Sequence, residues 1–343
     1  MKTLKDISWD VSEPEYRADP ALSYSVLAKF EREGFDGLNT LFDKIDTPSL
    51  TFGSAVDALV TGGQEEFENR FFVAEFPQLS DSVLKVVNEC FTRGSEQYTS
   101  LEEFPDKAII GITEDLKYQL NWKPETRAKV IREQGGEYYH LLFVAGDRKV
   151  VSTSFKSEVD NCVALLMGSP ATSVYFTSLA YERWYQLKFK AVLGDFEYKC
   201  MADMLLVDNE HKVIYPVDLK TSGHPEWDFY DSFIQWNYQI QARLYWRIIR
   251  DNLDKDEYFK DYRLANYRFV VISRKTATPL VWEFEDTQVY GTLCYGRDCK
   301  VEMRDPLDIG EELYSYLLSR PLVPAGIKLN EPNNITKWIN EKK

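Results

Sequence analysis

Alternating apolar and polar residues predict a group of strands in the second half of the chain. Three such runs follow one another with only short turns between them, at 183–192, 197–207 and 212–220. Neighbouring strands joined by connections this short are antiparallel, so the runs predict a meander. Pro216 lacks the N–H that a central strand would donate, and we expect a bulge just before Asp218 to accommodate it.

Helical spacing of apolar residues dominates most of the remaining chain. Ser23 or Ser25 would cap the first helix, and Gly62-Gly63 would stop the second. The expected helices cover about 22–30, 50–61, 80–95, 155–168 and 226–252, with another from about 287. Two further strands are expected at 267–273 and 279–285.

Strands packed by helices predict a mixed α/β fold, and a chain of 343 residues that is 44% hydrophobic can bury a large core. We interpret residues 1–343 as a single domain. Its expected parts are an extended segment over 1–21, a mainly helical part over 22–170, an α/β core over 171–300, and a helix and tail over 301–343. Within that tail, we expect residues 320–343 to form a loop and a short helix at the end.

The net charge is −14, from 41 Lys and Arg against 55 Asp and Glu. This acidity argues against broad, sequence-independent coating of nucleic acid, although a local basic groove and a bound metal ion are compatible with it. No apolar run is long enough for a transmembrane helix, and the first residues lack the apolar core of a signal peptide. We therefore expect a cytoplasmic protein that does not associate with membranes.

The five cysteines are scattered and form no Cys-x-x-Cys pair; they are Cys90, Cys162, Cys200, Cys294 and Cys299. This pattern indicates neither a zinc site nor a disulfide framework. We expect free and mostly buried thiols.

Asp218 and Lys220 place an acid and a lysine on one face of a predicted strand, because residues two apart share a face. Asp203 interrupts the apolar run of the preceding strand. Two carboxylates can bind Mg²⁺ through oxygen, and a lysine can orient an attacking water or stabilise charge on a phosphate. The alternative is a buried ion pair between Lys220 and one of the acids.

Two further acids are candidates for the same metal. Glu182 lies just before the first strand of the meander, and Asp57 follows Gly53 by four residues on one helical face. Gly53 would allow close approach of backbone or substrate. The alternatives are an ordinary surface carboxylate for Glu182 and a solvated helix acid for Asp57.

The predicted helix over 226–252 carries Tyr238, Gln241 and Tyr245 on one face. Polar side chains in such a stripe suit contact with phosphates or bases, although an aromatic face packed on the sheet explains them equally well. Thr221 and Ser222 directly follow Lys220, and their hydroxyls would hydrogen-bond a phosphate.

In this order the residues resemble the PD-(D/E)XK nuclease superfamily, most closely the RecE-type phage recombination exonucleases and the wider RecB nuclease group. The matching pieces are Gly53 to Asp57, Glu182, Asp203, Asp218-Leu-Lys220-Thr221 and Gln241-Ala-Arg-Leu-Tyr245. The resemblance spans about residues 22–250. It implies a restriction-endonuclease-like mixed β-sheet flanked by helices, with an N-terminal helical elaboration.

The resemblance also implies roles for these residues. Asp203 and Asp218 would be metal ligands, Lys220 the catalytic lysine, and Glu182 an acid close to the metal. Gln241 and Tyr245 would form the family's Gln-x-x-x-Tyr motif. Many relatives carry histidine where this chain has Asp57, which can still bind Mg²⁺. Some relatives hold an iron–sulfur cluster through four cysteines, but Cys294 and Cys299 lack the necessary partners, so we expect none.

The expected function is that of a Mg²⁺-dependent DNA exonuclease, with Mn²⁺ as a substitute, acting on double-stranded ends in phage or mobile-element recombination. A phage-encoded enzyme would work in the host cytoplasm. The resemblance implies a single-strand annealing protein as partner, and it leaves open the homo-oligomeric ring of processive relatives. Two alternatives remain: a single-strand-specific or end-trimming nuclease, and an inactive nuclease fold that binds DNA or serves a structural role.

Overall fold

The computed structural model of the protein describes residues 2–43, 47–274, 276 and 278–319. The chain divides into two compact units. We call residues 1–53 together with 164–343 the sheet unit, and residues 54–163 the helical unit. The predicted single domain over 1–343 stays a prediction, and the predicted end helix within 320–343 lies outside the described residues.

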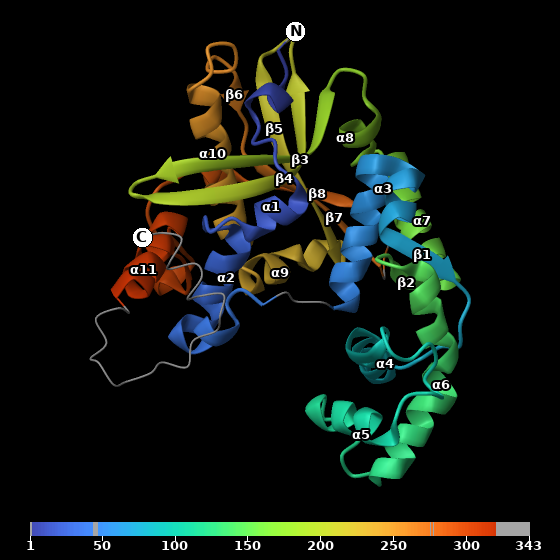
Figure 1. The fold of residues 1–343 in the computed structure, drawn as a ribbon. Helices are drawn as coiled ribbons and strands as arrows, with labels where there is room; N and C mark the ends of the chain where they lie inside the picture. The colour runs from blue at the N-terminus through green and yellow to red at the C-terminus, as the bar shows by residue number, and fades with distance from the viewer. Residues whose placement is uncertain (1, 44–46, 275, 277, 320–343) are drawn as a thin grey trace. The chain divides into compact units, whose positions relative to one another are not determined.

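A six-stranded mixed sheet forms the centre of the sheet unit (Figure 1). Its path is β3-β4-β5-β7-β8, and the short strand β6 lies beside β5. The strands are β3 (Glu182–Leu193), β4 (Phe196–Asp208), β5 (Val213–Ser222), β6 (Arg263–Leu264), β7 (Tyr267–Ser273) and β8 (Leu280–Phe284). The antiparallel pairings of β3 with β4 and of β4 with β5 confirm the predicted meander, whereas β5 pairs with β7 in parallel.

Helices flank this sheet and share its hydrophobic core, which confirms the mixed α/β class. The long helix α10 packs against β3, β4 and β7, and it also contacts α2, α9 and α11. The helices of the sheet unit are α1 (Glu13–Ala18), α2 (Tyr24–Glu33), α8 (Ser173–Thr177), α9 (Phe229–Gln235), α10 (Tyr238–Asp254) and α11 (Pro306–Ser319). Short 3₁₀ turns are η1 (Leu4–Ile7), η2 (Gly34–Thr40), η3 (Glu226–Asp228), η4 (Glu285–Gln288) and η5 (Arg297–Cys299).

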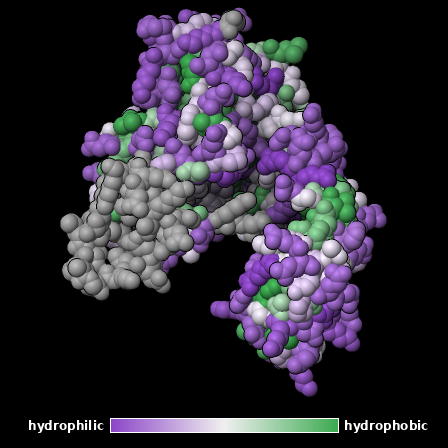
Figure 2. Space-filling model, viewed as in Figure 1, coloured by the Kyte–Doolittle hydropathy of each residue, from purple (hydrophilic) through white to green (hydrophobic). Residues whose placement is uncertain are grey.

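The helical unit has a separate hydrophobic core, built mainly from α4, α5 and α6. Hydrophilic residues cover most of its visible face in Figure 2. Its elements are β1 (Phe71–Ala74), α4 (Asp81–Gly94), α5 (Asp106–Asp115), α6 (Pro124–Ala145) and β2 (Lys149–Ser152), and β1 pairs with β2 in parallel. Two helices cross the boundary between the units, α3 (Pro48–Arg70) and α7 (Thr153–Gly168). Gly63 leaves the helical conformation, with φ 69° and ψ −157°, and divides α3 into two helical stretches, as the predicted stop at Gly62-Gly63 requires.

Two predicted elements differ from the structure because local backbone chemistry intervenes. The helix expected over 226–252 is broken, since Asn237 takes a left-handed conformation with φ 54° between α9 and α10. The segment 1–21, expected to be extended, contains η1 and α1. Ser12 and Glu15 form a capping box that starts α1, and Leu4 is completely buried.

The helix expected from about 287 is also wrong. After η4 the chain forms an antiparallel pair of short strands, β9 (Leu293–Tyr295) and β10 (Val301–Met303), and only then the helix α11. Pro216 needs no bulge, because it pairs with Leu205 in regular register on one side. On the other side β5 pairs with β6 at residues 213–214 and with β7 from residue 217, so Pro216 falls in the gap between the two.

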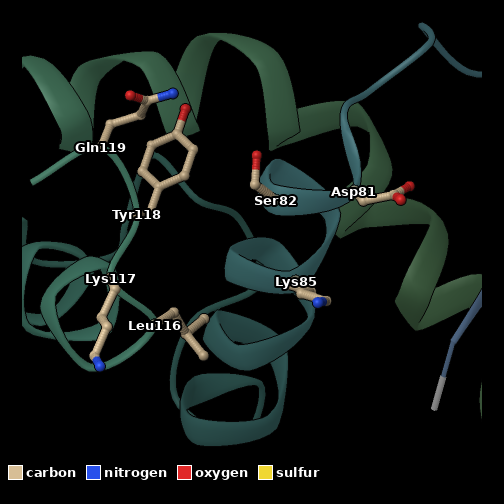
Figure 3. Close-up of a pocket in the computed structure, with 7 residues that line it drawn as sticks. All are labelled: Asp81, Ser82, Lys85, Leu116, Lys117, Tyr118 and Gln119. Carbon is tan, nitrogen blue, oxygen red and sulfur yellow. The ribbon is translucent and has the colours of Figure 1, made fainter.

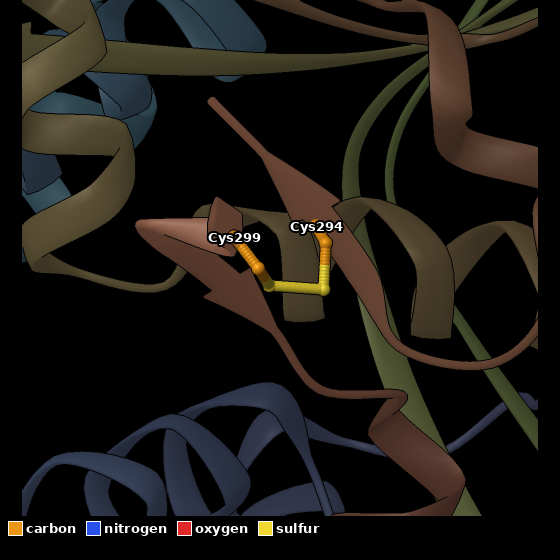
Figure 4. Close-up of a disulfide and its surroundings, with 2 residues drawn as sticks. All are labelled: Cys294 and Cys299. Carbon is orange, nitrogen blue, oxygen red and sulfur yellow. A yellow bond between two sulfur atoms is a disulfide. The ribbon is translucent and has the colours of Figure 1, made fainter. Parts of the chain in front are cut away.

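The expectation of free thiols holds for three of the five cysteines. Cys90, Cys162 and Cys200 are free and buried, but Cys294 and Cys299 form a disulfide between β9 and η5 (Figure 4). The turn that joins these elements brings their Cα atoms to 4.8 Å, within the usual range for a disulfide. Within the described part of the chain, no helix is both long and apolar enough to cross a lipid bilayer.

Candidate active site

The acid and the lysine of β5 meet as an ion pair on one face of the sheet. Nζ of Lys220 lies 2.5 Å from Oδ2 of Asp218. Asp218 is completely buried, whereas the side chain of Lys220 keeps 19% of its surface exposed. Burying an unpaired carboxylate costs free energy, and the ion pair with the Lys220 ammonium group offsets part of that cost for Asp218.

Asp203 of β4 faces Asp218 across the strand pair. The pair Met204–Val217 is in register, and the next position along both strands brings Asp203 opposite Asp218. Oδ2 of Asp203 accepts a hydrogen bond of 3.2 Å from the backbone N–H of Leu219, which shows that its carboxylate reaches β5. Two like charges directly opposite each other destabilise a sheet, so nearby positive charge would stabilise this pair of carboxylates.

Two side chains hold the other carboxylate oxygen of Asp218, one from helix α10 and one from strand β7. The side-chain amide of Gln241 donates a hydrogen bond to Oδ1 of Asp218, and the hydroxyl of Tyr267 on β7 lies 3.5 Å from the same oxygen. Tyr245, one turn after Gln241, packs edge-on against Tyr267 with ring centroids 6.3 Å apart. Oε1 of Gln241 is buried and accepts no hydrogen bond from the residues that the structure describes.

Lys220 is held in its charged form by its neighbours. Burial by itself lowers the pKa of the ammonium group. The nearby Asp218 carboxylate, together with Tyr238 and Asp203, raises the pKa by more than burial lowers it, so the pKa of Lys220 lies above its usual value. Nζ also lies 4.7 Å from the centre of the Tyr238 ring, a cation–π geometry. At neutral pH Lys220 is therefore a cation that can stabilise negative charge, and it is unsuited to act as a base.

Hydroxyl groups and a guanidinium group follow the lysine at the ends of β5 and β7. A Cβ atom at Gly53 would lie 3.1 Å from Oγ1 of Thr221, closer than most such contacts, so a larger residue there would press on the Thr221 hydroxyl. The backbone N–H of Arg274 donates to the carbonyl of Ser222 at 3.2 Å. The Arg274 guanidinium stacks 4.1 Å over the ring of Phe52. These donors suit a phosphate.

The structure does not bring Glu182 into this group. Glu182 pairs with Val207, which lies four residues along β4 from Asp203, a separation of about 13 Å at the rise of a strand. Its carboxylate accepts a hydrogen bond of 3.1 Å from Asn209. The antiparallel register explains the difference, because the start of β3 meets the end of β4.

Asp57 lies in the helical unit, where Arg70 Nη1 is 3.7 Å from its Oδ2. Its predicted role as a metal ligand stays a prediction.

The oxygen atoms around Asp218 fit a divalent cation of the Mg²⁺ type. Mg²⁺ is usually bound by one or two carboxylates with water and substrate oxygens completing the shell. Asp203 and Asp218 are two such carboxylates, and Oε1 of Gln241, buried and without a hydrogen-bond partner among the described residues, is a further oxygen beside Asp218. The described residues contain no group of three or more His, Cys, Asp or Glu side chains that could hold a metal.

Tyr267 and Arg274 were not predicted from the sequence as residues of this site. Tyr267 begins a strongly apolar run, so its hydroxyl was the only signal that the strand also carries a polar function. Arg274 gives no periodic signal, because it lies just past the end of β7. A separate pocket of about 570 Å³ lies in the helical unit (Figure 3). It is lined by residues from α4 and from the turn after α5, and none of them belongs to the group around Asp218.

Comparisons with known proteins find a distant structural neighbour, whereas no protein-family model and no curated protein matches the chain. Among solved structures the chain is similar to a protein from Eubacterium rectale named "Putative exonuclease". The two chains are 15% identical, the match covers 100% of this chain and 88% of that chain, and the TM-score is 0.40. A likeness this distant gives no information about any reaction that the protein catalyses.

Proposed function

We propose that this protein is a divalent-metal-dependent deoxyribonuclease, and more narrowly a Mg²⁺-dependent exonuclease that acts on double-stranded DNA ends. The observation that carries the proposal is the opposition of Asp203 and Asp218 on neighbouring strands, with Lys220 paired to Asp218. Two facing carboxylates and a protonated lysine are a costly arrangement for a fold. They suit the hydrolysis of a phosphodiester, in which negative charge grows on the phosphate.

Each residue has a defined task in this proposal. Asp203 and Asp218 would hold the metal, which when bound supplies an activated water and a positive charge. Lys220 stabilises the charge that develops on the phosphate oxygens. Gln241 and Tyr267 fix the orientation of the Asp218 carboxylate.

Binding of the substrate falls to the groups at the ends of β5 and β7. The hydroxyls of Thr221 and Ser222 and the guanidinium of Arg274 would bind phosphates of the DNA backbone. Tyr238 and Tyr245 serve mainly in packing, because both rings contact other aromatic rings of the core. The DNA contacts predicted for these two tyrosines and for Gln241 are therefore replaced in the proposal by a supporting role.

The test measures the degradation of linear double-stranded DNA with Mg²⁺ by the wild type and by Lys220→Ala. The matched control is Lys260→Ala, which removes an exposed lysine that forms an ion pair with Glu257 on the surface. We expect the control to retain activity and Lys220→Ala to lose at least two orders of magnitude of it, the size typical for removal of one charge-stabilising group. Equal degradation by all three proteins would exclude the proposed site.

A substrate panel separates the narrower proposal from its alternatives. Blunt, recessed and single-stranded DNA, each labelled at one end, distinguish a double-strand exonuclease from a single-strand-specific or end-trimming enzyme. An inactive DNA-binding scaffold predicts no cleavage of any substrate and no thermal stabilisation by Mg²⁺. The proposed enzyme predicts stabilisation, because a cation relieves the repulsion between Asp203 and Asp218.

A further inference from the structure

Gln186 has a backbone conformation that sets it apart from the rest of the sheet. Its φ is 53°, in the left-handed region, although it is a glutamine in the middle of β3. No other residue within the described strands of the six-stranded sheet has a positive φ. Glycine would adopt this conformation at little cost, whereas a side chain with a Cβ atom is strained there. Strained residues gather at functional sites, where the surrounding structure holds them in place.

The position of Gln186 in the sheet is opposite Asp203. The pairs that flank it are Tyr185 with Met204 and Leu187 with Ala202, so the register leaves Gln186 across from Asp203. Asp203 in turn lies opposite Asp218 on β5. Three residues with side-chain oxygens therefore stand in one row across β3, β4 and β5.

In both strands of the β3–β4 hairpin, the set of residues that faces the core shifts by one position at the same place. On β3 the core-facing residues are even-numbered before Gln186, as at Trp184, and odd-numbered after it, as at Leu187 and Phe189. On β4 the same change occurs around Asp203, between Ala202 and Leu205. An irregularity of this kind re-aims side chains next to active sites. Here it affects the two facing residues Gln186 and Asp203 together.

We propose that the amide oxygen of Gln186 is a third protein ligand of the divalent cation held by Asp203 and Asp218. The proposal rests on the function proposed above and adds a residue that sequence reasoning did not single out. A neutral oxygen donor adds a ligand without adding negative charge to a pair of carboxylates that already repel each other.

The chemistry of a neutral ligand predicts a weakly held cation. The affinity of an oxygen site for a divalent cation rises with the number of charged ligands. Two carboxylates with an amide and a nearby ammonium group would bind Mg²⁺ or Mn²⁺ less tightly than three carboxylates. Replacement of Gln186 by glutamate should therefore tighten binding while it keeps the size and shape of the side chain.

The experiment measures Mn²⁺ binding to the DNA-free protein by calorimetry, together with the midpoint of thermal unfolding without metal. Gln186→Gly removes the amide and relieves the left-handed backbone. The control is Gln119→Gly in the helical unit, where Gln119 is exposed and also has a positive φ of 43°. We expect Gln186→Gly to unfold at the same or a higher temperature and to bind Mn²⁺ about tenfold more weakly. We expect Gln186→Glu to bind it severalfold more tightly, and Gln119→Gly to bind it as the wild type does.

Two outcomes overturn the inference, and they differ in what they say of the proposed function. If the wild type and both Gln186 variants bind Mn²⁺ equally and cleave DNA, Gln186 is a structural residue and the nuclease assignment stands. If the wild type neither binds Mn²⁺ nor cleaves DNA, the ligand role and the proposed function fail together.

Discussion

The side-chain amide of Gln241 donates a hydrogen bond to Asp218, joining the middle of α10 to a completely buried carboxylate of β5. Asp218 thus has a cation on one oxygen and a neutral donor on the other. A group that orients a metal-binding or charge-bearing carboxylate affects activity without touching the substrate. In the proposed function Gln241 is therefore a positioning residue.

Substitution Gln241→Leu should lower nuclease activity about 10- to 100-fold, the usual loss when a residue that supports a metal ligand is removed. The measurement is the rate of DNA degradation per folded molecule. Gln239→Leu is the control, because Gln239 is buried on the same helix but bonds to Arg243 and to the carbonyl of Arg304. If both variants lose the same activity, the effect is one of helix packing and the assigned role is wrong.

Arg274 should contribute to binding through one phosphate contact. Its guanidinium stacks on the ring of Phe52, and its backbone N–H donates a hydrogen bond to the carbonyl of Ser222 at the end of β5. We expect Arg274→Ala to weaken DNA binding and to reduce the slope of log affinity against log salt by about one. Arg268→Ala is the control, since Arg268 lies on β7, just before Arg274 in the chain, but forms an ion pair with Glu283. An unchanged slope for Arg274→Ala would exclude the contact.

The disulfide between Cys294 and Cys299 should stabilise the fold by closing a short loop. A loop of this length is expected to contribute roughly 2 kcal/mol to the free energy of unfolding, on the chain-entropy model. Denaturant unfolding with and without a thiol reductant measures the difference. The double variant Cys294→Ser/Cys299→Ser should be insensitive to reductant, and a wild type that is equally insensitive would show that the bond does not form in solution.

Much of the sheet could be predicted because its sequence signals are local. Strands β3, β4, β5, β7 and β8 follow from alternation and turn residues, and their bounds differ from the predicted ones by at most two residues. Asp218 and Lys220 share a face through the two-residue period of a strand. Gln241 and Tyr245 share one through the helical period. Each of these relations needs only the spacing of residues along one element.

The remaining parts depended on pairings that spacing does not contain. The position of Glu182 is decided by the register between β3 and β4, which is a relation between two strands. The break before α10 depends on one backbone angle at Asn237. Strands β9 and β10 are so short that hydrophobic periodicity cannot distinguish them from a helix. The disulfide beside them was not expected, because an odd number of scattered cysteines does not indicate a pairing. Gln186 offers no sequence signal, because its left-handed conformation is a property of the folded hairpin.

Lys199 should make stability depend on pH in an unusual direction. It is buried on β4, where it donates hydrogen bonds of 2.6 Å to the carbonyls of Tyr16 and Asp19. Burial lowers the pKa of this lysine from 10.5 to about 8. Between these two values the unfolded chain binds more protons than the folded one, so the contribution of Lys199 to stability rises with pH. Below pH 8 both states are protonated, and the fold carries the full cost of the buried charge.

The test compares the free energy of unfolding of the wild type and of Lys199→Met at pH 7.5 and pH 9.5. The wild type should gain about 1–2 kcal/mol relative to the variant across this interval, since the limiting slope for one proton is about 1.4 kcal/mol per pH unit. Lys260→Met is the control, because Lys260 is exposed and its hydrogen bond with Glu257 raises its pKa above the usual value. Its difference from the wild type should stay flat up to pH 9.5. A flat difference for Lys199→Met as well would mean that Lys199 remains fully charged in the folded protein throughout this range.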